Sequence, residues 1–277
     1  MSRPVTDKYC VIGNPIAHSK SPQIHAAYAR QTGQDLTYER CLAPVDGFAA
    51  TVQRLVAEGY RGANVTVPFK LEAATLATRL APRAQAAGAV NTLIFAHGDI
   101  VGDNTDGPGL VADIVRNAGV PLAGKRILLL GAGGAARGAL LPLLLENPRQ
   151  IVIANRTLAT ADRLVADFKD HAQRLAVSAF ADVEGGFDVV VNATSASLAA
   201  DVPPVPSPVF GPGVLALDMM YGNKPTVFME FAASRGASVR DGLGMLVEQA
   251  AEAFLLWRGV RPGTDEVLAS MRQPMQQ

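Results

Sequence analysis

A glycine-rich turn between an apolar run and a helical segment constrains the fold of this chain more than any other feature. Residues 126–130 (RILLL) have the character of a buried strand, the turn G-A-G-G-A-A occupies 131–136, and a helical segment follows. The spacing G-x-G-x-x-A lets a dinucleotide pyrophosphate lie against the backbone at a helix N-terminus. A turn that only closes a βα unit is the alternative, but the strand before it and the helix after it favour dinucleotide binding. Because the turn starts only at residue 131, the preceding segment is long enough to be a domain that holds the substrate.

The composition argues against several classes of protein. Of the 277 residues, 49% are hydrophobic and 18% are charged, so the chain can bury a sizeable core. Lys and Arg together number 25, as do Asp and Glu, which leaves no overall basic footprint for nucleic acid. No apolar run approaches the length of a membrane-spanning helix, and the first residues lack a signal-peptide pattern. We therefore expect a small-molecule substrate, with neither nucleic acid nor a membrane as a partner.

The cysteines and histidines indicate a reducing compartment and no metal site. Cys10 and Cys41 both fall in expected strands, where buried thiols are more common than a disulfide, so we expect a cytoplasmic protein. The histidines are scattered along the chain without metal-ligand spacing: His18, His25, His97 and His171.

Strand and helix signals alternate along the chain, which is typical of an α/β protein. In the first half we expect strands at 9–12, 36–42, 63–67 and 90–95, helices at 21–32, 48–58 and 71–80, and a hairpin turn at 97–99. Ser21 before Pro22 is the expected N-cap of the first helix. In the second half we expect strands at 126–130, 151–154, 188–191 and 215–218, and helices at 109–117, 226–235 and 245–257, with a weak final helix after 263.

We place a domain boundary at the polar, turn-rich segment 102–107. Residues 1–107 are expected to form an α/β substrate-binding and catalytic domain with a mostly parallel sheet. Residues 108–242 are expected to form a Rossmann-type dinucleotide-binding domain. The helix at 245–257 has no wholly polar face and must be buried, so we expect the C-terminal helices, residues 243–277, to return to the first domain.

The end of the second Rossmann strand favours NADP over NAD. NAD-specific folds carry an acidic residue about 20 positions after the glycine turn, which holds the ribose 2′-hydroxyl. Here the strand ends in Asn155-Arg156-Thr157, without a carboxylate. Arg156 could pair with a 2′-phosphate. The plainer reading, in which Thr157 caps the next helix and Arg156 is a solvated charge, is compatible with this role.

Three groups of polar residues stand out in the first domain. Ser19 and Ser21 precede or begin a helix, where two hydroxyls and a helix N-terminus could hold a carboxylate. Asn64 and Thr66 alternate with valines and so share one face of a strand. Lys70 lies just beyond the end of that strand, where α/β sheets bind ligands.

The third group contains Asn91 and, after the hairpin, Asp106. Taken singly, Lys70 is more often a surface lysine and Asp106 more often a turn residue. A chain that binds NADP and has no candidate metal site needs a proton carrier, however, and His18 is the only histidine in an evident βα loop. A Lys70–Asp106 pair is therefore a plausible acid/base.

Together these motifs resemble the shikimate dehydrogenase family. The matching segments follow the family's order over nearly the whole chain: residues 13–22, 62–70, 88–92, 102–107, 131–138, 155–157, 192–195 and 241–250. The resemblance implies a two-domain oxidoreductase that reduces 3-dehydroshikimate to shikimate with NADPH, a step of aromatic amino-acid biosynthesis.

The resemblance also implies roles for individual residues. Lys70 is the catalytic lysine, with Asp106 as its partner. The substrate carboxylate is held by Ser19 and Ser21. Ring contacts are implied for Asn64, Thr66, Asn91, Asp106, Tyr221 and Gln249. Cofactor contacts are implied for Gly131, Ala132, Gly133, Gly134, Ala135, Asn155, Arg156, Thr157, Thr194, Met219, Gly242 and Met245.

This chain departs from the family's pattern in two places that bear on the cofactor. The family often has a second basic residue where this chain has Thr160, so the phosphate clamp is thinner and some tolerance of NAD is expected. After Asn-Ala-Thr-Ser the family usually has a glycine, whereas this chain continues Ala196-Ser197-Leu198.

Three other functions stay open. A quinate/shikimate dehydrogenase with broader substrate and cofactor choice differs only in the ring pocket. A folate-linked methylene dehydrogenase shares the architecture, but Ser19, Ser21 and Asp106 argue against it. An NADP-binding sensor would not need Lys70 and Asp106. The sequence is compatible with a monomer or a homodimer.

Overall fold

The computed structural model describes residues 6–272 of the chain and divides it into two compact units. The first unit contains residues 1–109 and 247–277, and the second contains residues 110–246. The divisions fall at 109/110 and 246/247, beside the expected boundaries at 107/108 and 242/243.

The first unit is built on a mixed sheet of six strands in the order β2-β1-β3-β5-β6-β4. β1 is parallel to β2 and β3, and β4 is parallel to β6, whereas β5 runs antiparallel to both of its neighbours. The strands are β1 (Asp7–Gly13), β2 (Leu36–Leu42), β3 (Tyr60–Val65), β4 (Arg79–Leu80), β5 (Thr92–Ala96) and β6 (Asp99–Asp103). The helices are α1 (Ser21–Thr32), α2 (Phe48–Ala57), α3 (Lys70–Leu76) and α4 (Pro82–Ala87). α5 (Asp106–Ala112) begins in the first unit and passes at Leu110 into the second, where it continues as a π-helical turn over Asp113–Asn117.

One hydrophobic cluster of this unit lies between the sheet and α2 and α3. Phe48 of α2 stacks on Phe69, with ring centroids 4.9 Å apart, and both rings are buried against Val65 and Leu93 of the sheet. Phe69 immediately precedes α3, so this packing fixes where Lys70 begins the helix.

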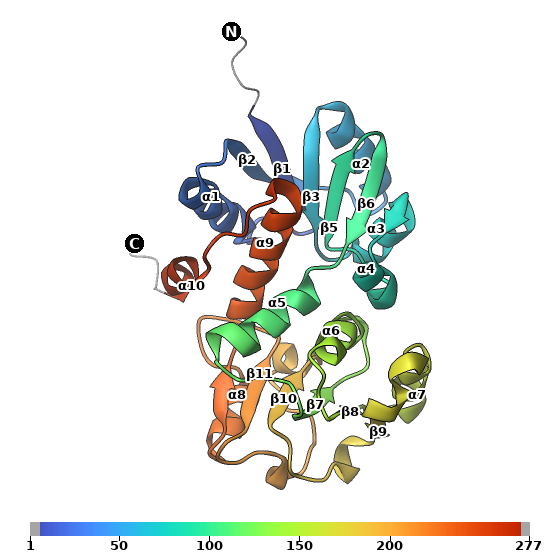
Figure 1. Ribbon diagram of the computed structural model, residues 1–277, viewed down its shortest axis with the longest axis vertical. Helices are drawn as coiled ribbons and strands as arrows, with labels where there is room; N and C mark the ends of the chain where they lie inside the picture. Colours follow the sequence, from blue (N-terminus) through green and yellow to red (C-terminus); the bar gives the residue numbers. More distant parts are fainter. Residues whose placement is uncertain (1–5, 273–277) are drawn as a thin grey trace. The chain divides into compact units, whose positions relative to one another are not determined.

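The last long helix, α9 (Leu243–Arg258), lies against the first sheet over its C-terminal part (Figure 1). Trp257 Nε1 donates to the carbonyl oxygen of Leu93 at 3.0 Å. The hydroxyl of Tyr28 donates to the carbonyl oxygen of Val247 at 2.9 Å. From Val247 onward α9 belongs to the first unit, and residues 243–246 belong to the second. α10 (Asp265–Arg272) follows in the place of the weak final helix.

The second unit has six parallel strands in the order β12-β11-β10-β7-β8-β9, which is the Rossmann order. The strands are β7 (Arg126–Leu130), β8 (Gln150–Ala154), β9 (Leu175–Ser178), β10 (Val189–Asn192), β11 (Leu215–Asp218) and β12 (Ser238–Arg240). The α-helices are α6 (Gly134–Leu145), α7 (Leu158–Ala166) and α8 (Val227–Ala233). The chain order reverses between β7 and β10, so the loops after these strands border the position where such sheets bind nucleotides.

Several local features differ from what the sequence predicted. The segment 71–80 is not one helix, because Thr78 leaves the helical path and donates its backbone N–H to the carbonyl oxygen of Ile100, which starts β4. Pro82 then starts α4, which we did not predict. Lys20, not Ser21, occupies the N-cap position of α1, and no side chain caps that helix.

Both cysteines are free and buried, as expected. Within residues 6–272, none of the helices combines the length and the apolar character that crossing a bilayer requires. The cytoplasmic location and the oligomeric state stay predictions.

Candidate active site

Lys70 and Asp106 form a close ion pair at the start of two helices. Lys70 Nζ lies 2.6 Å from Asp106 Oδ2. The two side chains are 32% and 25% exposed, so the pair is partly desolvated but a ligand can still reach it. The backbone of Lys70 is also held, because its carbonyl oxygen accepts from Val90 N at 2.9 Å. The pairing expected from sequence is therefore present in the structure.

Asn91 orients the other oxygen of this carboxylate. Its Nδ2 donates to Asp106 Oδ1 at 2.9 Å and to Thr105 Oγ1 at 2.9 Å. Its Oδ1 accepts from the backbone N–H of Thr105 at 2.8 Å. Asn91 is buried, so bulk water does not compete for these hydrogen bonds, and they fix the rotamer of the amide.

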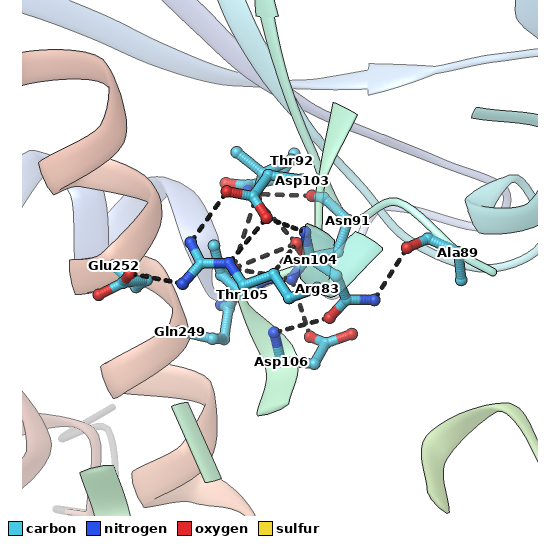
Figure 2. A network of polar contacts seen from close by, with 11 residues as sticks. Arg83, Ala89, Asn91, Thr92, Asp103, Asn104, Thr105, Asp106, Gln249 and Glu252 are labelled. Atoms are coloured by element: carbon cyan, nitrogen blue, oxygen red, sulfur yellow. Dashed lines mark hydrogen bonds and ion pairs between the residues drawn. The ribbon is translucent and has the colours of Figure 1, made fainter. Parts of the chain in front are cut away.

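Gln249 enters the same cluster from α9, far away in sequence (Figure 2). Its Oε1 lies 3.3 Å from both Asn91 Nδ2 and Thr105 Oγ1. Gln249 is therefore brought beside the Lys70–Asp106 pair by the return of α9 to the first sheet.

Asn64 and Thr66 differ in how they are placed. Asn64 is the last residue but one of β3 and is buried, and its Nδ2 donates to Asn91 O at 3.2 Å and to Thr92 Oγ1 at 3.1 Å. Thr66 lies just past the strand, which ends at Val65, and its backbone N–H donates to Ile12 O at 2.9 Å. Both remain at the edge of the sheet where Lys70 follows.

Ser19 and Ser21 lie at the same edge of the sheet. β1 and β3 are parallel, and Asn14 N donates to Val67 O at 3.1 Å, which ties together the loops after these strands. Ser21 N donates to Ser19 Oγ at 3.3 Å, and the guanidinium of Arg40 donates to Ser19 O at 2.6 and 3.1 Å. The two hydroxyls thus lie at the N-terminus of α1, which is favourable for an anionic group.

Tyr38 was missed by sequence reasoning. Its hydroxyl donates to Asn64 Oδ1 at 2.7 Å, and its ring stacks on His25 with centroids 4.1 Å apart. Burial raises the pKa of Tyr38 well above its ordinary value, so the hydroxyl stays a donor. Tyr38 occupies an ordinary position of β2, and nothing in the sequence distinguishes it.

His25 should make the stability of the protein depend on pH. Burial lowers the pKa of His25 from 6.5 to about 3, and the ring is stacked on Tyr38. The unfolded chain therefore binds more protons between these two values, so the free energy of unfolding is retained above 6.5 and falls as the pH drops below it. We expect a loss of about 2 kcal/mol between pH 7 and about pH 5 in urea unfolding, and a clearly smaller loss in His25→Phe.

A suitable control is His97→Asn, at the exposed hairpin turn, where Asn tolerates the positive φ of 53°. It should leave the pH dependence unchanged. An equal loss in the unsubstituted chain and in His25→Phe would show that other groups cause it.

The glycine turn of the second unit has the shape of a diphosphate cradle. Gly131 has a φ of +102°, and a Cβ there would lie 3.1 Å from Thr194 Cγ2. Gly133 and Gly134 are exposed, and a Cβ on either would meet nothing within 4 Å. No side chain caps α6, so its first N–H groups, with the adjacent Ala132 and Ala135, can face an anion. The turn therefore fits the pyrophosphate of NADP.

The end of β8 fits the additional phosphate of NADP. Asn155 Nδ2 donates to Thr157 O at 2.9 Å, which shapes the loop. Thr157 occupies the N-cap position of α7 but its side chain makes no capping hydrogen bond. Arg156 is exposed and makes no ion pair or hydrogen bond with the other residues between 6 and 272. Its guanidinium is therefore available to a ligand.

The remaining expected cofactor residues lie in loops after β10 and β11 or at the start of α9. Thr194 donates its hydroxyl to Asn192 Oδ1 at 2.7 Å, and Met219 N donates to Asn192 O at 3.0 Å. A Cβ on Gly242 would overlap the carbonyl of Met219, so glycine is required there. Met245 is half-buried on α9.

Ser197, which stands where the family usually has glycine, donates its hydroxyl to the buried Asp218 at 2.6 Å. Tyr221 lies in the second unit after β11, and its place beside the substrate stays a prediction. Among residues 6–272 there is no group of three or more His, Cys, Asp or Glu side chains that could hold a metal ion.

Comparison with known proteins gives a consistent result along the chain. Residues 11–93 match the profile of the shikimate dehydrogenase substrate binding domain. Residues 113–200 match the shikimate / quinate 5-dehydrogenase profile, and residues 242–272 match the shikimate 5'-dehydrogenase C-terminal domain.

Full-length relatives agree with these domain matches. A protein of Herminiimonas arsenicoxydans named shikimate dehydrogenase (NADP(+)) is 64% identical over 97% of this chain and 98% of its own length. An Ael1 enzyme from Pseudomonas putida, whose crystal structure is known, has 50% sequence identity to this chain. The two structures match with a TM-score of 0.93 over 98% of this chain and 100% of that one. The shikimate 5-dehydrogenase of Thermus thermophilus, solved with NADP(H) and shikimate, is 31% identical, with a TM-score of 0.84 over 96% and 100% of the two chains.

Proposed function

The chain belongs to the shikimate dehydrogenase family, and on this premise we propose that it catalyses the reversible reduction of 3-dehydroshikimate to shikimate with NADPH, in aromatic amino-acid biosynthesis. The observation that carries the proposal is the Lys70–Asp106 ion pair, held by Asn91 in a cluster of buried amides and hydroxyls. Such a cluster suits a small ring that carries several hydroxyl groups, because each amide can donate and accept.

Lys70 is the acid/base in this proposal. NADPH supplies a hydride when it is bound. As negative charge develops on the carbonyl oxygen, the Lys70 ammonium donates a proton to it, and in the reverse direction the amine accepts the proton of the hydroxyl. Asp106 accepts from Lys70 Nζ and orients both the amine and the substrate hydroxyl.

The other residues bind and position the ligands. Ser19 and Ser21 hold the substrate carboxylate at the N-terminus of α1. Ring hydroxyls are held by Asn64, Thr66, Asn91 and Gln249, and Tyr221 borders the ring. In the second unit, the turn at 131–135 holds the pyrophosphate and residues 155–157 hold the adenosine phosphate. Thr194, Met219, Gly242 and Met245 border the nicotinamide.

A direct assay tests the function. The purified chain is mixed with NADP+ and shikimate, and the absorbance of reduced nicotinamide is followed, with quinate in a parallel reaction. Rapid reduction with shikimate and little with quinate is the expected result. Equal turnover of both acids would favour a quinate/shikimate dehydrogenase, and no turnover with either would reject the proposal.

Arg156 should decide the choice between NADP and NAD. Arg156→Ala removes the exposed guanidinium and with it a charge-assisted contact to the 2′-phosphate, worth about 1.5–3 kcal/mol. The substitution should therefore lower kcat/KM with NADP+ roughly 10- to 100-fold. The value with NAD+ should change little, since NAD lacks the 2′-phosphate. Arg163→Ala, an exposed arginine on α7, is the control and should leave both values unchanged. An unsubstituted chain without preference for NADP+, or an Arg156→Ala variant that keeps it, would contradict this role.

A further inference from the structure

The segment that carries Asp106 is held mainly by side chains. Between the end of β6 and the start of α5, Asn104 N donates to Asp103 Oδ1 at 2.7 Å, and Asp106 N donates to Asn104 Oδ1 at 3.1 Å. Asn104 Nδ2 donates to Ala89 O at 3.0 Å. The position of the Asp106 carboxylate therefore depends on where the side chain of Asp103 is held.

Arg83 holds that side chain and also reaches α9 (Figure 2). Its Nε and one terminal nitrogen bind the two oxygens of Asp103 at 2.7 and 2.9 Å, in the bidentate geometry that only a guanidinium provides. The remaining nitrogen donates to Glu252 Oε1 at 2.8 Å. Glu252 lies one helical turn after Gln249 on α9, so one side chain joins the Asp106 segment to the helix that carries Gln249.

A second arginine completes the link on the side of α9. Arg261 donates to Glu252 Oε2 at 2.6 Å and to Glu248 Oε2 at 2.9 Å. Burial alone would raise the pKa of Glu252, but the ion pairs with Arg83 and Arg261 hold it below its usual value. Glu252 therefore stays charged and keeps its hold on Arg83.

We propose that Arg83 is a positioning residue for the reaction: by binding Asp103 and Glu252 together, it sets the distance between Asp106 and Gln249 around the substrate ring. The role rests on the proposed function. Arg83 touches neither Lys70 nor Asp106 in any described contact, and it acts through Asp103 and α9. Its loss would leave Asp103, which is 7% exposed, as a buried carboxylate without its cation, and the segment would shift to admit water.

The kinetic constants for the two ligands separate this role from a general loss of stability. We expect Arg83→Gln to raise the KM for shikimate and lower kcat, with a combined loss in kcat/KM of about 10- to 100-fold, the size expected for displacing a site residue by about 1 Å. The KM for NADP+ should stay within about twofold, because the cofactor residues lie in the other unit. Arg83→Lys should recover part of the loss, since it keeps the charge but not the bidentate contact.

Arg258→Gln is the matched control. Arg258 is the last residue of α9, its side chain is 17% exposed against 23% for Arg83 on α4, and it pairs with Asp7. Its loss should lower the melting temperature by a similar amount and leave the KM for shikimate unchanged. If Arg83→Gln does not fold, Asp103→Asn removes the same ion pair with little change of shape and should raise the same KM.

The possible results are distinguishable. No turnover by the unsubstituted chain would reject the proposed function itself. With an active parent, an Arg83→Gln variant within about twofold of its kcat/KM would overturn the positioning role. An equal rise in the KM values for shikimate and NADP+ would also overturn it. The same holds if Arg258→Gln loses as much kcat/KM as Arg83→Gln, or if Arg83→Lys is no more active than Arg83→Gln.

Discussion

Replacing Lys70 by alanine is expected to lower kcat by roughly 10²- to 10⁴-fold, the range for one acid/base group, with little change in the KM for shikimate. The amine is the group closest to Asp106, at 2.6 Å, and its removal leaves the carboxylate without its ion-pair partner and the reacting oxygen without a proton donor. The residues proposed to bind the ring hydroxyls and the carboxylate remain in this variant, so we expect binding to be largely kept. Steady-state kinetics with shikimate and NADP+ measure both constants.

Lys125→Ala is the matched control for this experiment. Lys125 also forms a lysine–aspartate ion pair, with Asp188 at 3.0 Å, and its side chain is 38% exposed. It directly precedes β7, however, whereas the glycine turn follows the other end of that strand. It should leave kcat unchanged. A Lys70→Ala variant within a few-fold of the parent kcat would mean that Lys70 only binds substrate.

Replacing Arg240 by alanine is expected to lower the free energy of unfolding by about 3–5 kcal/mol, because it would leave a buried aspartate without a cation. Asp113 is fully buried in the π-helical turn after α5, and the guanidinium of Arg240 donates to its two oxygens at 2.6 and 3.2 Å. A Cβ on Gly244 would overlap the same carboxylate, so the backbone at the start of α9 leaves it no room to move away. Urea unfolding followed by circular dichroism measures the loss.

Arg54→Ala provides the comparison for an ion pair in solvent. Arg54 pairs with Glu58 one turn later on the surface, with both side chains about half exposed, so solvent screens the pair and its loss should cost little. If Arg240→Ala costs no more than Arg54→Ala, water must reach Asp113 in the variant and the pair is not needed for folding.

The regular elements were predictable where each one carries its own local signal. The strand at 126–130 is a continuous apolar run, the helix at 21–32 ends at Gly33 in the left-handed conformation, and the hairpin turn at 97–99 contains a glycine with positive φ. The segment 71–80 was mispredicted because its helical pattern is overridden by the pairing of β4 with β6, which follows it in the chain. A strand of two residues carries too little local signal to be recognised.

The candidate site was only partly predictable. Lys70 and Asp106 stand out as charged residues just after strands, and Asn91 lies within the expected strand at 90–95. Their resemblance to a family motif points to a role. Tyr38 and Arg83 carry no such signal. Tyr38 occupies an ordinary strand position, and Arg83 lies on a helix that was not expected, so their contacts with Asn64 and Asp103 are visible only in the folded chain.

Residue order alone was enough to specify the two α/β units and the dinucleotide turn, because strand periodicity, glycine conformation and helix starts are properties of neighbouring residues. The Lys70–Asp106 pair was expected from the need for a proton carrier and from the family motif, not from a local pattern. The folding of the chain in three dimensions decided which distant groups hold that pair in place. Gln249 reaches Asn91 beside that pair, and Glu252 reaches Arg83, because α9 is buried against the first sheet. Arg83, at the start of α4, binds both Asp103 and Glu252. Burial and hydrogen bonding over such distances depend on packing, which no local pattern contains.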